Sequence, residues 1–218
     1  VSPENIIVNG PYKDKNALKK YLINGSNVNI DGYVEARHVT SLAIEFSSFS
    51  FSVGLRCNFE IQENSISRFG FDISDNVFFD LLANLKAIKN VELNGLHCHF
   101  PDRSLESFVS RTERILKLSD QIFDAPPKFI DIGGGYFGYI AESLQEQFST
   151  SVPSYSEYAE TVASKFYEHY KNVDEKNRPE LILEPGSALV GDVMSFVARI
   201  VDIKNVRGRN IATSSGRK

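Results

Sequence analysis

The feature that most constrains the fold is a regular alternation of short apolar runs with longer amphipathic segments. The apolar runs predict strands and the amphipathic segments predict helices. We expect strands at Asn5–Asn9, Asn27–Asp31, Phe51–Asn58, Glu92–Phe100, Lys128–Ile132 and Glu180–Glu184. Between them we expect helices at Lys13–Ile23, Tyr33–Phe46, Asp75–Lys89, Ser104–Phe123 and Ser156–Tyr170. This alternation of strands and helices predicts an α/β fold with a parallel sheet.

Six consecutive βα units fit either an open doubly wound sheet or most of an eight-stranded barrel. Polar side chains at or near the C-terminal ends of the strands favour the barrel, because barrel enzymes place their chemistry there. These residues are Arg56, Asn58, His97, His99, Asp131 and Glu184. We therefore expect residues 1–192 to form an incomplete TIM-like (β/α) barrel, with six of eight βα units.

The pattern changes after the sixth strand. Val193–Val206 predicts a strand that no crossover helix precedes. We therefore expect residues 193–218 to contain the first strand of a C-terminal β domain.

The composition of the chain limits the classes of function that it can have. The chain has 218 residues, of which 42% are apolar and 24% charged, so it can bury a sizeable core. Its formal net charge of −4 argues against a nucleic-acid-binding face. No apolar run approaches the roughly eighteen residues that span a bilayer. We expect a soluble, cytoplasmic protein with a small-molecule ligand.

The two cysteines and the chain ends carry less information. Cys57 and Cys98 lie inside strand-like runs and lack the spacing of a zinc site or a disulfide framework, so we expect buried free thiols. The chain has no initiator Met and no signal peptide, and we expect it to be a piece of a longer protein.

Two of the strands end abruptly in glycine. One runs through Asp131 into Gly133–Gly135, and the other runs through Glu184 into Pro185 and Gly186. Each therefore brings bare backbone N–H groups and one carboxylate to the same edge of the sheet. Such an edge can hold a phosphorylated cofactor.

The same glycines have two simpler interpretations. Gly133, Gly135 and Gly138 have the spacing of the dinucleotide fingerprint, but that fingerprint needs a helix that opens within the glycines. We expect no helix between these glycines and about Ser156, which argues against a dinucleotide site. A purely structural glycine turn remains open.

His97 and His99 are two residues apart, so their side chains point to one face of a strand while Cys98 points to the other. Two histidines at this spacing suit a metal, but no further ligand motif supports one, and we expect no metal. Contact with a cofactor is favoured, and a structural role remains open.

Arg56 and Glu184 each place a charge at the end of an apolar strand. Arg56 should face an anion or a polar cavity, or else pair with a local carboxylate. Glu184 can keep the ring nitrogen of a heteroaromatic cofactor protonated, or else cap a neighbouring loop.

Seven short motifs follow one another along the chain: Ile6–Pro11, Asn29–Asp31, Leu55–Arg56, Ser67–Gly70, Gly95–His99, Asp131–Gly135 and Glu184–Gly186. Each motif alone is a weak signal, but their shared order and spacing form a strong one. The set resembles the diaminopimelate/ornithine/arginine decarboxylases, which are fold-type III pyridoxal-phosphate enzymes with an alanine-racemase-like barrel. The resemblance covers nearly the whole chain.

The resemblance implies a role for each site residue. His99 would stack on the pyridine ring, Glu184 would pair with the pyridinium nitrogen, and Arg56 would lie beside the cofactor. Gly133, Gly134 and Gly135, with Gly186, would bind the phosphate of pyridoxal 5'-phosphate through backbone N–H groups. The protonated ring would act as an electron sink while an α-amino acid loses CO₂. The full-length protein would be a homodimer.

The sequence also departs from the family. Asp102 stands where the family commonly has a phosphate-binding serine, so its carboxylate must point away or Ser104 must take over. Ser187 stands where an arginine usually follows Glu-Pro-Gly. The Schiff-base lysine would lie upstream of residue 1, and Lys13 is a poor substitute by context. We therefore expect residues 1–218 alone to be inactive.

Three functions remain open. The favoured one is a fragment of a pyridoxal-phosphate-dependent amino-acid decarboxylase. A racemase of the same fold shares the cofactor and differs mainly in the bond that is broken at Cα. A non-catalytic, partner-binding homologue is motivated by Asp102 and Ser187.

Overall fold

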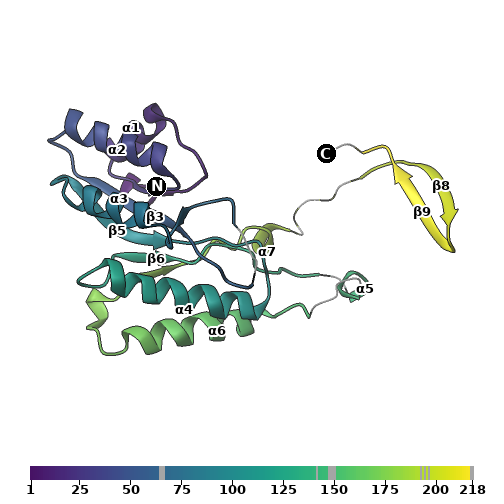
Figure 1. Ribbon diagram of the computed structural model, residues 1–218. Coiled ribbons are helices and arrows are strands. Elements are labelled where there is room, and N and C mark those ends of the chain that lie inside the picture. The colour runs from purple at the N-terminus through teal and green to yellow at the C-terminus, as the bar shows by residue number, and fades with distance from the viewer. Residues whose placement is uncertain are drawn as a thin grey trace.

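The computed structural model describes residues 1–63, 67–140, 142–146, 151–191, 193, 195 and 197–216. Its main sheet is parallel and curls into a half-barrel with helices packed around it (Figure 1). The strands follow one another across the sheet in chain order, and the short β4 (Phe71–Asp72) pairs beside β3. They are β1 (Ile7–Val8), β2 (Asn27–Ile30), β3 (Phe51–Asn58), β5 (Val91–His97), β6 (Phe129–Asp131) and β7 (Glu180–Ile182). The predicted incomplete TIM-like barrel is confirmed.

Side-chain caps fix where the helices begin. The side chains of Asp14, Asp75, Ser104 and Ser154 accept hydrogen bonds from backbone N–H groups in the first turns of α1, α3, α4 and α6. The five long helices are α1 (Lys15–Ile23), α2 (Tyr33–Glu45), α3 (Asn76–Lys86), α4 (Leu105–Ile122) and α6 (Tyr155–Tyr170). Their predicted positions are confirmed to within a few residues. None of the helices in the described part of the chain is long and apolar enough to cross a membrane.

Several short elements of the described chain were not predicted; each has only two to four residues, and such a length carries little periodic signal. They are β4, the helices α5 (Glu142–Gln145) and α7 (Ser187–Val190), and the 3-10 turns Pro3–Asn5 and Glu175–Asn177. The predicted strands are mostly longer than the observed ones. In particular, β5 ends at His97 and β7 at Ile182, so His99 and Glu184 lie in the segments that follow their strands.

The C-terminal segment forms a hairpin. A strand was expected over Val193–Val206, but β8 covers Ile200–Val206, and residues 192, 194 and 196 of this region lie outside the described residues. A second strand, β9 (Arg209–Ser214), pairs with β8 in antiparallel fashion. The turn between them has positive φ at Arg207 (55°) and Gly208 (82°), as a two-residue type I′ turn requires. Figure 1 shows this hairpin apart from the main sheet. The domain boundary at residue 192 remains a prediction.

The core lies between the sheet and the helices and is rich in aromatic side chains, among them Phe51, Phe78 and Phe108. Cys57 and Cys98 are both buried and free, as predicted. Burial raises the pKa of both thiols, that of Cys98 to about 12. Both are therefore protonated at neutral pH and suit packing rather than nucleophilic chemistry.

Candidate active site

The register of three neighbouring strands sets the base of the site. Arg56 on β3 pairs with His97 on β5, and His97 pairs with Asp131 on β6. The three residues are 7%, 2% and 0% exposed. Partners in a parallel register project to the same face. Three ionisable side chains are therefore held in one buried row at the C-terminal ends of the strands, where the sequence predicted the chemistry.

Glu184 joins this row from the segment after β7. Its Oε2 lies 3.2 Å from Nδ1 of His99 and 3.6 Å from Nε2 of His97, and its Oε1 accepts a hydrogen bond from Nδ2 of Asn9. Burial raises the pKa of Glu184, but the contacts with the two imidazoles lower it to well below its usual range. Glu184 is thus an anion facing two histidines, and in the described structure its side chain does not cap a neighbouring loop.

A second carboxylate lies next to Glu184. Oδ1 of Asp131 accepts from the N–H of Gly133 at 2.8 Å, and Oδ2 lies 3.4 Å from Nδ2 of Asn9. Burial raises the pKa of Asp131 despite the opposing effect of His97, and the negative charge of Glu184 raises it further. The amide of Asn9 therefore bridges two carboxylates that repel each other.

Asn9 was not among the predicted site residues. It directly follows β1, and its Oδ1 accepts from Nδ2 of Asn29 on β2 at 2.7 Å. The available signal was its position, because Asn9 is a polar residue just past a strand end, like Glu184 past β7. Its uncharged side chain made it less conspicuous than the ionisable residues.

The glycine turn packs tightly against the segments on either side. Gly133 and Gly135 have φ of +71° and +94°, which side-chain-bearing residues rarely adopt. A Cβ on Gly133 would collide with the carbonyl oxygen of Cys98, and one on Gly134 with the carbonyl oxygen of Glu184. Residues 132–140 contain no helix, so the structure contradicts the dinucleotide interpretation. Gly186, with φ of +41°, precedes α7 and supplies a second glycine corner.

Asp102 and Ser104 occupy the turn before α4. Oδ1 of Asp102 accepts from the N–H of Ser104 at 2.7 Å, and Oγ of Ser104 accepts from the N–H of Ser107 at 3.2 Å. Both side chains therefore organise the start of the helix. Contact between Ser104 and a cofactor remains a prediction.

Two cations at the strand ends are already paired. Nη1 of Arg56 lies 2.9 Å from Oδ2 of Asp31, which is the local ion pair that the sequence left open. Nζ of Lys13 lies 3.0 Å from Oε1 of Glu35 and donates to the carbonyl of Gly10. Lys13 is thus used in a buried ion pair, in keeping with its being a poor Schiff-base lysine. A contact between Arg56 and a cofactor remains a prediction.

Arg111 on α4 was also missed. Its side chain is fully buried, and its guanidinium donates to the carbonyl oxygens of Gly134 and Asp102. It lies three residues after Phe108, on the apolar face of the helix, which was the available signal. Its charge argued for solvent exposure instead, because arginine is rarely buried completely.

The cluster suits a cofactor with a heteroaromatic ring and an anionic group. Nδ1 and Nε2 of His97 are buried and have no hydrogen-bond partner among the described residues. The glycine turn brings backbone without side chains to the site, and Gly135 is its partly exposed residue. Glu184 supplies a stable negative charge. His97, His99 and Glu184 also place three possible metal-ligand atoms within 4.8 Å of one another, so this geometry by itself does not exclude a metal.

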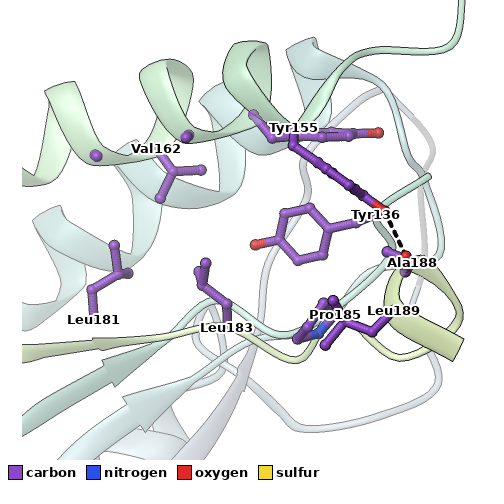
Figure 2. A pocket seen from close by; sticks show the side chains of 11 residues that line it. Tyr136, Tyr155, Val162, Leu181, Leu183, Pro185, Ala188 and Leu189 are labelled. Atoms are coloured by element: carbon purple, nitrogen blue, oxygen red, sulfur yellow. Dashed lines mark hydrogen bonds between the residues drawn. The ribbon is translucent and has the colours of Figure 1, made fainter. Parts of the chain in front are cut away.

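The apolar pocket in Figure 2 shares no lining residue with this polar cluster. It has a volume of about 250 Å³ and lies between α6 and the end of β7. Val162 and Tyr155 reach it from α6, and Leu181 and Leu183 reach it from β7 and the segment after it. None of the predicted site residues lines it.

The C-terminal ends of the curled parallel sheet carry a buried ionisable row, a carboxylate beside two imidazoles and a turn of three glycines. This half-barrel therefore has the features expected of a cofactor-binding domain. Residues 1–191 match the family described as "Pyridoxal-dependent decarboxylase, pyridoxal binding domain". The chain belongs to this family, and the predicted family is confirmed.

Curated relatives agree with this assignment. Diaminopimelate decarboxylase of Haemophilus influenzae is 25% identical over 198 residues, which are 84% of this chain and 43% of the relative. Diaminopimelate decarboxylase of Vibrio cholerae is 23% identical over 222 residues, which are 96% of this chain and 50% of the relative. The chain thus spans about half the length of the curated relatives it matches.

Solved structures show the same fold. Diaminopimelate decarboxylase of M. jannaschii superposes with a TM-score of 0.74 at 19% identity, covering 99% of this chain and 51% of that one. The arginine decarboxylase of Paramecium bursaria Chlorella virus has a TM-score of 0.67 at 16% identity, covering 97% of this chain and 53% of that one.

Proposed function

We propose that this chain forms the cofactor-binding half of a pyridoxal-phosphate-dependent decarboxylase, which releases CO₂ from an α-amino acid. The observation that carries the proposal is the position of Glu184, an anion held against His99 and His97 beside the glycine turn. A carboxylate with a lowered pKa is the group needed to keep a pyridine nitrogen protonated.

The site residues divide into three roles in this proposal. Glu184 holds a proton at the ring nitrogen, and His99, which is partly exposed, stacks on the ring. Gly135 and Gly186, with Ser104, bind the phosphate, while Arg56 flanks the cofactor from β3. Gly133 and Gly134, whose N–H groups donate to Asp131 and His99, shape the turn around the phosphate. Bound pyridoxal phosphate supplies an electron sink for the negative charge that remains at Cα when CO₂ leaves.

His97 and Asn9 position Glu184. Nε2 of His97 lies 3.6 Å from one carboxylate oxygen, and Asn9 donates to the other, so both oxygens are restrained. Asp131 adds negative charge nearby, which favours a cationic group at this end of the site.

The substrate class follows from relatives rather than from this chain. A solved diaminopimelate decarboxylase of Helicobacter pylori is complexed with L-lysine, and the Chlorella virus arginine decarboxylase is bound to agmatine. Both ligands carry a basic side group, so we propose an amino acid with a basic side chain. A homodimer and a cytoplasmic location rest on the family resemblance alone.

The test uses the complete reading frame that contains this chain, purified with pyridoxal phosphate. It is incubated with meso-diaminopimelate, lysine, ornithine and arginine, and CO₂ and products are quantified. We expect one substrate to yield equal amounts of CO₂ and the decarboxylated amine. An inverted enantiomer without CO₂ would identify a racemase. Cofactor absorbance without turnover would favour the non-catalytic homologue, and failure to bind the cofactor would refute the proposal.

A further inference from the structure

Arg111 is a buried cation without an ion pair in the described part of the chain. Its side chain is 0% exposed, and none of the ten ion pairs of the described residues includes it. The negative charge of Asp102 acts on it from nearby, but Oδ1 of that carboxylate is bonded to the N–H of Ser104. Burying an unpaired charge is costly, so an anion near this guanidinium would be strongly favoured.

The guanidinium joins the two turns that flank the site. Nη1 donates to the carbonyl oxygen of Gly134 at 2.9 Å, and Nη2 donates to the carbonyl oxygen of Asp102 at 2.6 Å. Nη2 also donates to Oγ of Ser107 at 2.8 Å, and the guanidinium lies 4.0 Å from the centre of the Phe108 ring. Arg111 therefore holds the turn after β6 against the turn before α4.

This contact fixes the direction of two backbone N–H groups. In a trans peptide the carbonyl of one residue and the N–H of the next point in opposite directions. Because Arg111 binds the carbonyl of Gly134, the N–H of Gly135 points away from Arg111, and the same holds for Asp102 and the N–H of Arg103. Neither N–H group donates to any residue that the structure describes.

The arrangement is suited to an anion. Two peptide dipoles have their carbonyl ends on a buried cation and their N–H ends directed away from it, which leaves both donors free to bind an anion. The positive charge behind the carbonyls strengthens each N–H as a donor. Charge-assisted hydrogen bonds of this kind are about twice as strong as neutral ones.

We propose that Arg111 is a positioning residue for the phosphate of the cofactor: it orients the N–H groups of Gly135 and Arg103 toward the phosphate and supplies the buried charge that balances it. This inference rests on the proposed function. It also explains how the phosphate is held in a chain that has Ser187 in place of the usual arginine after Glu-Pro-Gly and Asp102 in place of the usual phosphate-binding serine.

The competing explanation is that Arg111 only ties two turns together. A purely structural role would affect stability and would weaken the binding of any ligand equally. A role toward the phosphate changes the preference between pyridoxal phosphate and pyridoxal, which differ only by that group. This preference is therefore the decisive readout.

The experiment uses the complete reading frame and measures equilibrium dialysis of pyridoxal phosphate and of pyridoxal. Arg111→Met removes the charge while keeping much of the volume, and Arg111→Lys keeps the charge but loses the two-pronged contact. Arg114→Met is the matched control, because Arg114 is exposed on the same helix. Circular dichroism establishes that each variant is folded.

We expect Arg111→Met to weaken pyridoxal phosphate binding about tenfold or more, with pyridoxal binding nearly unchanged. Arg111→Lys should lie between Arg111→Met and the wild type, and Arg114→Met should match the wild type. An unchanged ratio of the two affinities in Arg111→Met would overturn the inference. If that variant does not fold, an unchanged ratio in Arg111→Lys would do so. The wild type separates the two possible failures. If it binds pyridoxal phosphate and the ratio is unchanged in the variant, only the inference about Arg111 fails. If the wild type binds no pyridoxal phosphate, the proposed function fails, and the inference fails with it.

Discussion

Oε2 of Glu184 lies 3.2 Å from Nδ1 of His99, and the N–H of Gly134 donates to that same ring nitrogen at 3.2 Å. One nitrogen cannot do both at once, because it needs a proton to donate to Glu184 and a lone pair to accept from Gly134. The two contacts therefore belong to different proton placements on His99. The imidazole links the charge of Glu184 to the position of the glycine turn.

The pH dependence of stability should separate the two neighbouring carboxylates. The pKa of Glu184 is lowered on folding, so its contribution is present above its ordinary value of 4.5 and is lost as the pH falls below it. Urea unfolding from pH 3 to pH 7 should show Glu184→Gln losing less stability toward acid than the wild type. Parallel curves for the two proteins would contradict this.

The contribution of Asp131 to folding stability should have the opposite pH dependence. Its pKa is raised, so the folded state binds the proton more tightly, and the stabilisation is lost as the pH rises through that raised value. We expect Asp131→Asn to be more stable than the wild type at pH 7, because the amide still accepts from the N–H of Gly133 without the buried charge. Asp131→Ala, which removes the acceptor, should be less stable than Asp131→Asn in the same urea titration.

Turnover should depend on Glu184 more than cofactor binding does. In the complete protein, Glu184→Gln should lower kcat about 100-fold or more, since the carboxylate acts on charge that develops in the transition state. The dissociation constant for pyridoxal phosphate should change far less. Glu180→Gln is the control, because Glu180 is exposed at the start of β7, the strand that precedes Glu184. Small and equal changes in kcat and KM would show that Glu184 is structural.

The glycine turn should tolerate no side chain. Gly133→Ala places a Cβ against the carbonyl of Cys98 and within 2.9 Å of Cβ of His99, at φ of +71°. Backbone strain alone costs about 1–3 kcal/mol, and the collision adds to it. Gly32→Ala is the control, because a Cβ there would meet nothing within 4 Å. Equal unfolding free energies for the two variants would refute this account.

The elements that the sequence located well are those with long periodic patterns or a cap. The helix α4 was expected at Ser104–Phe123 and is found at Leu105–Ile122, because Ser104 caps it and its apolar face is continuous. His99, Glu184 and Gly133–Gly135 were brought together as predicted, because parallel strands deliver their C-terminal ends to one edge. The hydrogen-bond or ion-pair partner of each side chain depends on distances between residues that are far apart in the sequence, and sequence patterns do not contain these distances. The identity of Asp31 as the partner of Arg56, and the burial of Arg111, therefore emerged only from the structure.

The ion pair of Lys13 and Glu35 should be a stability feature rather than a cofactor contact. Both side chains are almost fully buried, and removing one partner of such a pair costs about 3–5 kcal/mol. Lys13→Met should therefore lower the unfolding free energy strongly. Lys15→Met, which breaks the exposed pair with Glu45, should cost less than about 1 kcal/mol. A stable Lys13→Met protein that has lost cofactor absorbance would contradict this assignment.

Residues 1–218 in isolation should self-associate and lack decarboxylase activity. The terminal strands β1 and β7 are each paired along one side among the described strands, and open edges favour pairing between molecules. Beside β7, the apolar pocket of Figure 2 adds exposed Leu183 and Leu189. Leu189→Glu should therefore shift sedimentation velocity profiles toward monomer, whereas Val77→Glu, at an exposed site on α3, should not. A monodisperse wild-type monomer with decarboxylase activity would refute both parts of the prediction.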